Sequence, residues 1–419
     1  MRTARLVVAF AGFILIGISA GVSGVLLPSQ MSDYRIDKVV VGLQFFTFSS
    51  GYLLSGVANG ALIRRLGERA HLSLGAAVFV GTAIGIGLRP GFGVFLAATV
   101  LLGFGTGILD AGLNTFVGNL PGHTALLNYL HAFFGVGALI GPQVGTLLLH
   151  AGRPWPDAYL LMGIIAVPVL IGLATLYPSR LPPAPDAHAA PLSAALRRRS
   201  VWLSGAFLCL YVGIEVTVGD WGFSLLTQQR HAGELLAGLV VSGYWLGLTL
   251  GRFVINAAAS RAGLGVAAMM FCCMGGLVVT TTLTWWVPDA VVGAIGFGLI
   301  GFFLGPVFPT TVAVQPRLVP SQLVPTTVGL LVGASVVGGA GLPWLAGALA
   351  QGLGLGSLLP YTLVMSAILL GGWWAIARRI GSAGSPGSPG SPVDLARVSG
   401  PASVSGPAFG EAGDDRGGG

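Results

Sequence analysis

Long apolar runs recur along the whole chain and limit the folds open to it more than any other feature. About twelve lie between residues 5 and 379, and each is near the roughly 20 residues that a helix needs to cross a bilayer. Only 8% of the residues are charged and 54% are hydrophobic, which is too little polar surface to cover a water-soluble fold. The runs are longer than the strands of a transmembrane barrel and do not alternate apolar with polar residues as such strands do. The sequence therefore predicts an all-α membrane protein.

The runs fall into two sets of six. The expected spans are 5–28, 39–63, 71–89, 91–119, 125–150, 156–178, 200–227, 234–256, 263–286, 289–314, 322–350 and 356–379. We predict two six-helix bundles, 1–178 and 200–379, joined by a Pro- and Ala-rich cytoplasmic linker, 179–199. The Gly-Ser-Pro tail, 380–419, is expected to be disordered.

Arginines mark the expected orientation of the spans. They are more frequent on the side of the N-terminus, where Arg64, Arg65 and Arg197 lie, than on the other side, where Arg89 and Arg153 lie. The positive-inside rule then places both termini in the cytoplasm of a multi-pass protein of the plasma membrane, the inner membrane in a bacterium.

The two halves repeat short sequences in corresponding spans. Ser50-Gly-Tyr in span two recurs as Ser242-Gly-Tyr in span eight, and Gly103-Phe-Gly in span four recurs as Gly296-Phe-Gly in span ten. The separations are nearly equal, which favours an ancient duplication over coincidence, although each match alone is common in a Gly-rich chain.

Carboxylates inside apolar spans are the first candidates for function, because charge in the bilayer centre costs roughly 2.5 to 3.5 kcal/mol. Asp110 lies in span four, with Asn114 one turn later on the same face. Glu215 lies near the middle of span seven. We assign both carboxylates to reversible protonation, against the alternative that they only bond neighbouring helices. Asp220 is nearer the interface, where a gate-lining role is expected.

Other polar and aromatic residues are candidates for contact with a bound solute. The full set is Asn114, Asn128, His131, Gln143, Tyr211, Trp221 and Trp245, and Trp221 could present a flat face to a sugar ring. The alternative is that they bond helices together or anchor the membrane interface.

Several classes of function are excluded or not expected. The chain lacks a phosphate-binding Gly-rich loop ending in Lys-Ser or Lys-Thr, so it is not an ATP-driven pump, and no enzyme activity is expected. The three cysteines lie in apolar spans without metal-site spacing, and no metal or cofactor is predicted. The net charge of +7 includes no basic stripe, so nucleic acid is not an expected partner. A monomer in the lipid bilayer is expected.

The short turn between spans two and three resembles the signature loop of the major facilitator superfamily. Gly60, Arg65, Gly67 and Arg69 match its framework, whereas the usual acidic position holds Arg64. The resemblance implies a loop that latches one conformation; the alternative is an orientation signal.

More specific runs resemble the fucose/glucose-galactose permease branch of this superfamily. They begin at Leu109-Asp-Ala-Gly-Leu-Asn, Leu127-Asn-Tyr-Leu-His, Tyr211-Val-Gly-Ile-Glu and Gly243-Tyr-Trp-Leu-Gly. The resemblance implies that Asp110 takes part in proton coupling and that Asn114 faces a sugar. The branch also has an acidic residue before an apolar triplet and Pro in span one. Here Gly24 stands at that position before Val25-Leu-Leu-Pro28, and Glu215 is the substitute that the sequence offers.

From these features we expect a secondary transporter that moves a small polar organic solute, with a sugar as the preferred class, together with protons. Asp110 and Glu215 would exchange protons, while Asn128 and His131 would shape the inner gate. One alternative is a proton-driven exporter of drugs or metabolites, because Gly137-Ala-Leu-Ile-Gly-Pro-Gln-Val-Gly145 resembles a motif of superfamily antiporters. A second is a membrane sensor that does not transport.

Overall fold

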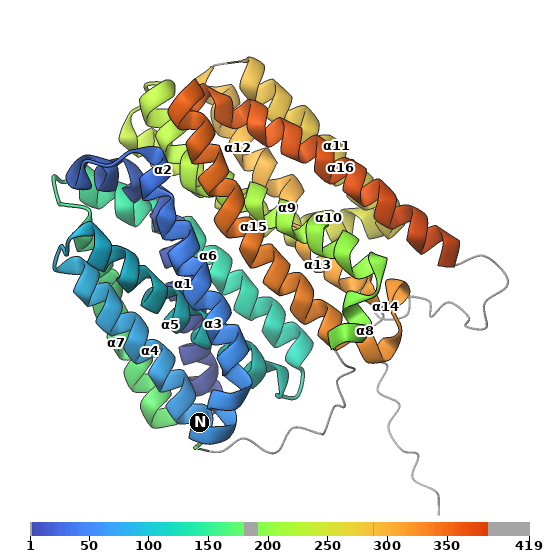
Figure 1. Ribbon diagram of the computed structural model, residues 1–419, viewed down its shortest axis with the longest axis horizontal. Coiled ribbons are helices and arrows are strands. Elements are labelled where there is room, and N and C mark those ends of the chain that lie inside the picture. The colour runs from blue at the N-terminus through green and yellow to red at the C-terminus, as the bar shows by residue number, and fades with distance from the viewer. Residues whose placement is uncertain (1, 180–191, 288, 384–419) are drawn as a thin grey trace, which may run out of the picture.

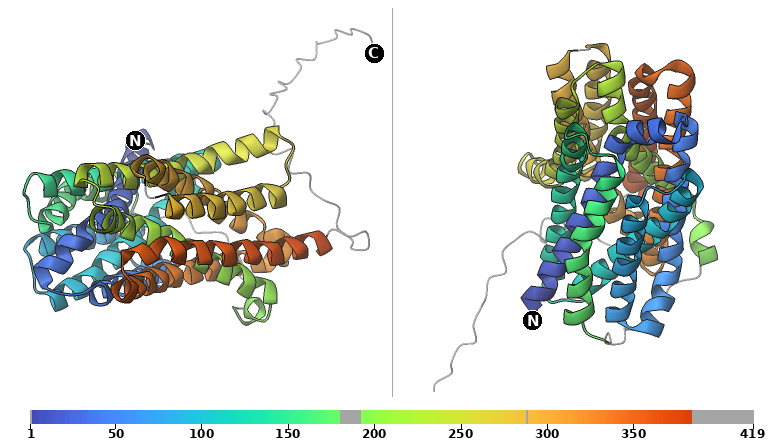
Figure 2. Two further views of the ribbon diagram at one scale, coloured as in Figure 1. Left: turned by 90° about the horizontal axis from the view of Figure 1, so that it is seen from above. Right: turned by 90° about the vertical axis from the view of Figure 1, so that its left-hand side faces the viewer.

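The structure is a computed structural model that describes residues 2–179, 192–287 and 289–383. Helix is the only regular secondary structure in these residues, and twelve helical segments among them are long and apolar enough to cross a membrane. The predicted all-α membrane architecture is confirmed. The helices run side by side along roughly one direction (Figures 1 and 2).

The helix bounds follow the predicted spans closely. The first six spans are α1 (Arg2–Tyr34), α2 with α3 (Lys38–Val41 and Leu43–Leu66), α4 (Glu68–Gly87), α5 (Phe92–Gly118), α6 (His123–His150) and α7 (Pro156–Leu176). The other six are α9 (Arg199–Ser224) with a π-helical turn (Leu225–Gln229), α10 (Glu234–Arg261), α11 (Val266–Trp286), α12 with α13 (Ala290–Leu304 and Val307–Ala313), α15 (Val324–Leu353) and α16 (Leu358–Ala383). Shorter helices are α8 (Leu192–Leu196) and α14 (Gln315–Leu318), and 3-10 turns cover Ser321–Leu323 and Leu355–Ser357.

Two expected spans are interrupted where the sequence carries a helix-breaking residue. Span two breaks at Gly42, and span ten breaks at Gly305-Pro306, where proline lacks the N–H that a continuous helix needs. The predicted linker contains α8, and the predicted tail begins with four residues that still belong to α16. Residues 180–191 of the linker and 384–419 of the tail lie outside the described residues.

The helices pair in the same way in each half. In the first half α1 packs along α6, α3 along α5 and α4 along α7. In the second half the corresponding pairs are α9 with α15, α10 with α12 and α11 with α16. The repeated tripeptides lie at two of these contacts: a Cβ on Gly103 would come 2.0 Å from the carbonyl oxygen of Phe48. In the second half the equivalent close approach lies at Gly247, one turn beyond Gly243. The pairing agrees with a duplicated architecture whose halves have since diverged.

The two ends of the bundle differ in how the halves meet. We call the end where α1 begins and α16 ends the terminal face, and the opposite end, where α1 finishes at Tyr34, the far face. The buried core of the second half includes five side chains from the first half, all in the middle of the molecule or toward the far face: Val25, Leu27, Val41, Phe45 and Ala138.

Polar and aromatic contacts between the halves follow the same distribution. Lys38 N–H donates to Gln351 Oε1 over 3.2 Å, and the Phe46 and Trp344 rings lie 5.8 Å apart edge to face. Gln143 on α6 and Ser242 on α10 join the halves by a hydrogen bond toward the far face, and the rings of Phe45 and Trp221 meet there edge to face. The halves are therefore closed against each other at the far face, and their helices diverge toward the terminal face (Figure 1).

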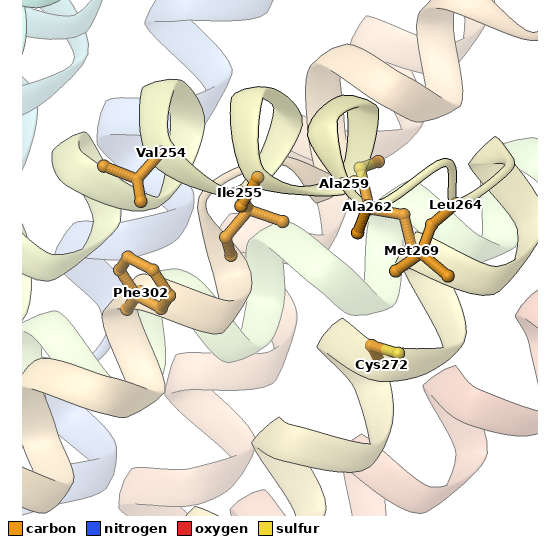
Figure 3. Close-up of a pocket in the computed structure, with 9 residues that line it drawn as sticks. Val254, Ile255, Ala259, Ala262, Leu264, Met269, Cys272 and Phe302 are labelled. Atoms are coloured by element: carbon orange, nitrogen blue, oxygen red, sulfur yellow. The ribbon is translucent and has the colours of Figure 1, made fainter.

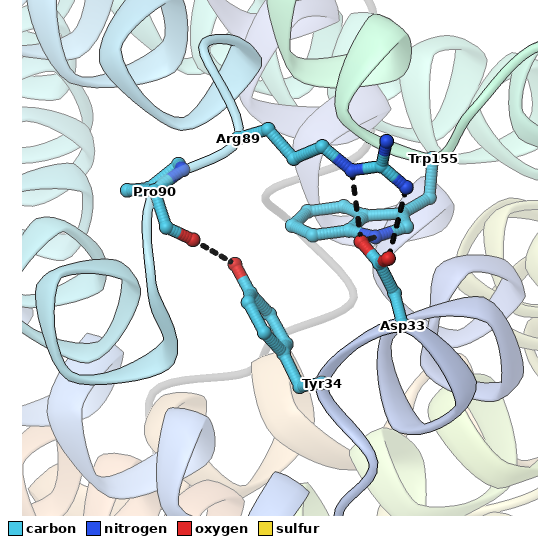
Figure 4. A network of polar contacts seen from close by, with 5 residues as sticks. All are labelled: Asp33, Tyr34, Arg89, Pro90 and Trp155. Atoms are coloured by element: carbon cyan, nitrogen blue, oxygen red, sulfur yellow. Dashed lines mark hydrogen bonds and ion pairs between the residues drawn. The ribbon is translucent and has the colours of Figure 1, made fainter.

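A polar network fixes the far end of the first half (Figure 4). Asp33 at the end of α1 accepts from both Nε and Nη2 of Arg89, over 3.1 and 2.8 Å, and from the indole of Trp155 over 2.9 Å. The neighbouring Tyr34 hydroxyl donates to the carbonyl of Pro90 over 2.9 Å. The network joins α1 to the α4–α5 connection and to the start of α7, so the far ends of these helices are held together.

Candidate functional site

Asp110 lies on α5 in a cluster of neutral donors. The Tyr52 hydroxyl of α3 donates to Oδ2, and Asn114 Nδ2 donates to Oδ1 over 2.9 Å. The predicted contact between Asp110 and Asn114 is thus present. No ion pair to Asp110 is seen in the described part of the chain. Both oxygens are satisfied without a cation, so any negative charge on this carboxyl has no counter-charge in the membrane.

Glu215 on α9 has a different environment, because a cation faces it. Its Oε1 lies 4.0 Å from Nη2 of Arg252 on α10. Both side chains are mostly buried, with 13% of Glu215 and 23% of Arg252 exposed. The Tyr244 hydroxyl donates to the backbone carbonyl of Glu215 over 2.8 Å. A buried ion pair compensates both charges, but loss of either partner would leave the other unpaired.

Two buried donors near this pair have no hydrogen-bond partner, namely Nε of Arg252 and the indole Nε1 of Trp245. The hydroxyl of Tyr211 lies beside both Glu215 and Arg252. Tyr211 lies one turn from Glu215 on α9, and the Trp245 ring packs against Gly219, one turn away in the other direction. Buried donors are nearly always paired in folded proteins, so two unpaired donors in one place, with the Tyr211 hydroxyl beside Arg252 and Glu215, indicate a position for acceptor groups.

The predicted residues of α6 lie in different places. His131 is exposed, packs edge-on against Phe13 with ring centroids 5.6 Å apart, and is close enough to Arg252 of the other half to be affected by its charge. Asn128, one turn nearer the terminal face, is also exposed. Gln143 instead donates to the Ser242 hydroxyl over 3.0 Å and so joins the halves toward the far face.

Trp221 belongs to the contact that closes the far face in this conformation. Its indole donates to the carbonyl of Pro343 over 2.9 Å, its ring meets Phe45 edge to face at 6.5 Å, and it is 1% exposed. Here the ring has no face open for a solute.

Gly24 lies at a close approach between helices of the two halves. A Cβ at this position would come 2.5 Å from both Cα and the carbonyl oxygen of Asp220. In this conformation a carboxylate at position 24 has no room. The backbone that stands against Gly24 is that of Asp220, about a turn and a half nearer the far face than Glu215.

The loop between α3 and α4 contacts its own half. Gly67 has φ of +78°, and a Cβ there would lie 2.0 Å from the carbonyl oxygen of Ser179, so only glycine fits. Arg69 donates through Nε to the carbonyl of Tyr177 over 2.6 Å, at the end of α7. Arg65 and Gly60 are exposed, and the described residues show no hydrogen bond or ion pair of Arg65.

An apolar cavity of about 250 Å³ lies elsewhere, between α10, α11 and α12 (Figure 3). Val254, Ile255, Met269 and Phe302 line it together with other small or apolar side chains. None of its lining residues is charged, so it offers no partner for a polar solute.

Two residues of the site were missed by the sequence analysis. Arg252 is a charged residue within a predicted span, and this alone was enough to mark it as a candidate. Its pairing with Glu215, however, depends on the contact between α9 and α10. Tyr52 belongs to the first repeated tripeptide, and its counterpart Tyr244 bonds Glu215, so the repeat itself indicated these two hydroxyls.

Sequence comparison relates the chain to known transporters. The family profile described as Major Facilitator Superfamily matches residues 9–219. The glucose/galactose transporter of Brucella abortus is 26% identical over 370 residues, covering 82% of this chain and 87% of that protein. The glucose/mannose transporter GlcP of Bacillus subtilis is 23% identical over 353 residues, covering 81% and 86%. Bypass of stop codon protein 6 of Saccharomyces cerevisiae is 24% identical over 404 residues, covering 86% and 80%.

Solved structures share the fold. A bacterial homologue of the human lysosomal transporter Spinster, in an inward-facing and unoccupied conformation, matches with a TM-score of 0.78 and 12% identity over 91% of this chain and 98% of that one. A D-xylose-proton symporter matches with a TM-score of 0.71 and 15% identity over 89% and 97%.

Proposed function

Because the chain belongs to the Major Facilitator Superfamily, whose members of this fold are transporters and not enzymes, we propose that it moves a small polar solute together with protons. A sugar is the preferred class of solute, since two of the relatives are named as sugar transporters. The two six-helix halves would expose a central site to each side of the membrane in turn.

The observation that carries the proton coupling is the environment of Asp110. Its carboxyl accepts from Tyr52 and Asn114 but has no cation beside it. Charge without a partner is costly in a membrane, so a proton neutralises this group at least in part of the cycle. Asn114 donates a hydrogen bond to the same carboxyl. A solute that contacts Asn114 would therefore also change how readily Asp110 binds a proton.

The side of the membrane to which the central site opens follows from the positions of the arginines. With the arginine-rich terminal face in the cytoplasm, closure at the far face makes this an inward-open state, and both termini lie inside. His131 and Asn128 then line the inner approach, while Trp221 and Gln143 belong to the outer closure. One chain supplies both halves of the site, so a monomer in the plasma membrane is sufficient.

The glycines of the motif shared with exporters have a packing role here. A Cβ on Gly137 or Gly141 would come 2.0 or 2.6 Å from backbone oxygens of α1. Helix packing therefore explains these glycines, and the motif does not by itself favour export.

Reconstitution in liposomes tests the proposal. Glucose, galactose, mannose and xylose are added outside vesicles that carry a pH-sensitive dye inside, with hydrophobic cations as a second panel. We expect at least one sugar to drive proton entry and to accumulate when the outside is acidic. Proton-driven movement of the cations alone would establish the exporter instead, and no exchange of any compound would favour the sensor.

A further inference from the structure

The ion pair between Arg252 and Glu215 is longer than the ion pairs of Arg89 and Arg153 at the far face. Its N···O distance is 4.0 Å, whereas Arg89 and Arg153 approach their carboxylates to 2.8 and 2.7 Å. Charge-assisted hydrogen bonds between guanidinium and carboxylate are typically about 2.7–2.9 Å. Glu215 therefore balances the charge of Arg252 without bonding to it directly, and Nε of the guanidinium remains unpaired.

The donors around this pair define the chemistry that fits. Arg252 Nε is buried without a partner, and the Tyr211 hydroxyl lies beside both Arg252 and Glu215. A guanidinium fork matches the two oxygens of a carboxylate, which accept and do not donate. A neutral hydroxyl would also accept, but it would add no negative charge beside Arg252.

A third donor lies further along the same side of α10. Trp245 and Arg252 are seven residues apart, which is two helical turns or roughly 10 Å, and the Trp245 indole N–H is likewise unpaired. A solute that reaches both is longer than a bare carboxylate and carries an acceptor at its other end. A sugar acid has this shape.

We propose that the transported solute is a carboxylate-bearing sugar, whose carboxylate binds Arg252 and Tyr211 in place of Glu215. This inference rests on the proposed transport function and specifies its substrate class. When the anion binds, Glu215 takes up one proton, so the cluster is neutral both with Glu215 paired to Arg252 and with solute bound. One proton then enters at Glu215 for each anion.

The groups that face Glu215 are consistent with this exchange. Tyr211 shares its helix, while Tyr244 and Arg252 come from α10, and His131 faces Arg252 from α6. Asp220 lies about a turn and a half away on the same helix. Arg252 is the one cation that contacts Glu215 in the described residues, so the anion and Glu215 compete for it.

The test compares acids with their neutral counterparts in proteoliposomes of the full chain. Counterflow of D-glucuronate, D-galacturonate and D-gluconate is measured against D-glucose, D-galactose and D-glucitol at equal concentrations. We expect at least one acid to exchange ten or more times faster than its neutral counterpart. R252Q should abolish that preference, while R261Q, at the exposed end of the same helix, should retain it. E215Q should still exchange the acid, but with a weaker dependence of the rate on pH than the parent.

A measurement on the unaltered protein covers the case in which R252Q does not fold. The melting temperature in detergent should rise with the preferred acid, more at pH 5.5 than at pH 8, and should not rise with its neutral counterpart. Neutral sugars that exchange while every acid fails would overturn this inference and leave proton-coupled sugar transport standing. Failure of all six compounds, with no proton flux for any solute, would overturn both.

Discussion

Replacing Gly24 by alanine should shift the balance between the two conformations of the transporter. The new Cβ would lie 2.5 Å from the backbone of Asp220, a distance at which the helices must move apart. Gly24 and Asp220 belong to different halves and meet where the far face is closed. Overpacking of this kind costs about 1–3 kcal/mol. If the halves separate there in the other conformation, the whole cost falls on the closed state, and the ratio of far-face-open to far-face-closed molecules rises roughly 5- to 150-fold.

The chain offers a matched control on the same helix. A Cβ on Gly21 would come 2.4 Å from the carbonyl oxygen of Ala138, which belongs to the same half. G21A should therefore lower stability without changing the balance of conformations. Spin labels at cysteines replacing Arg35 and Leu353, in a background without the three native cysteines, report the far-face distance by double electron–electron resonance. Equal distance distributions for G24A, G21A and the parent would refute the reasoning.

Two further substitutions test the site and the loop. Y52F removes one donor from the Asp110 carboxyl. Loss of a hydrogen bond to a buried charged group costs about 1–3 kcal/mol, so we expect the pH dependence of solute uptake to change. An unchanged pH profile would show that Tyr52 does not belong to the proton site. G67A places a side chain 2.0 Å from the Ser179 carbonyl at a φ of +78°, so the melting temperature should fall. G56A, at a position on α3 with open space around it, should leave the melting temperature nearly unchanged. Similar melting temperatures for the two variants would contradict the packing argument.

The fold was largely predictable because the length of an apolar run is itself the signal. Each of the twelve predicted spans has a helix, and their bounds agree within a few residues apart from the C-terminal ends of α1 and α10, which extend further than predicted. The interruption at Gly42 was not predicted. A glycine is common within membrane helices, so its presence does not by itself predict where such a helix is interrupted.

The site was predictable where it depends on one helix. Asp110 and Asn114 are four residues apart on α5, and their contact follows from helical geometry. The pairing of Glu215 with Arg252 joins two helices, and periodicity within either helix does not specify it. The same holds for Trp221, whose indole bonds Pro343 of α15 in this conformation. Which face of α9 meets α15 is decided by packing between distant segments.

Proton-driven accumulation by D110N gives the most direct test of the central claim. In liposomes with an acidic exterior, the parent should concentrate its solute, while D110N should exchange solute across the membrane but concentrate it less than the parent. This outcome follows because asparagine keeps the shape of the Tyr52 and Asn114 cluster but cannot carry a proton. Accumulation by D110N to the level of the parent would contradict the account.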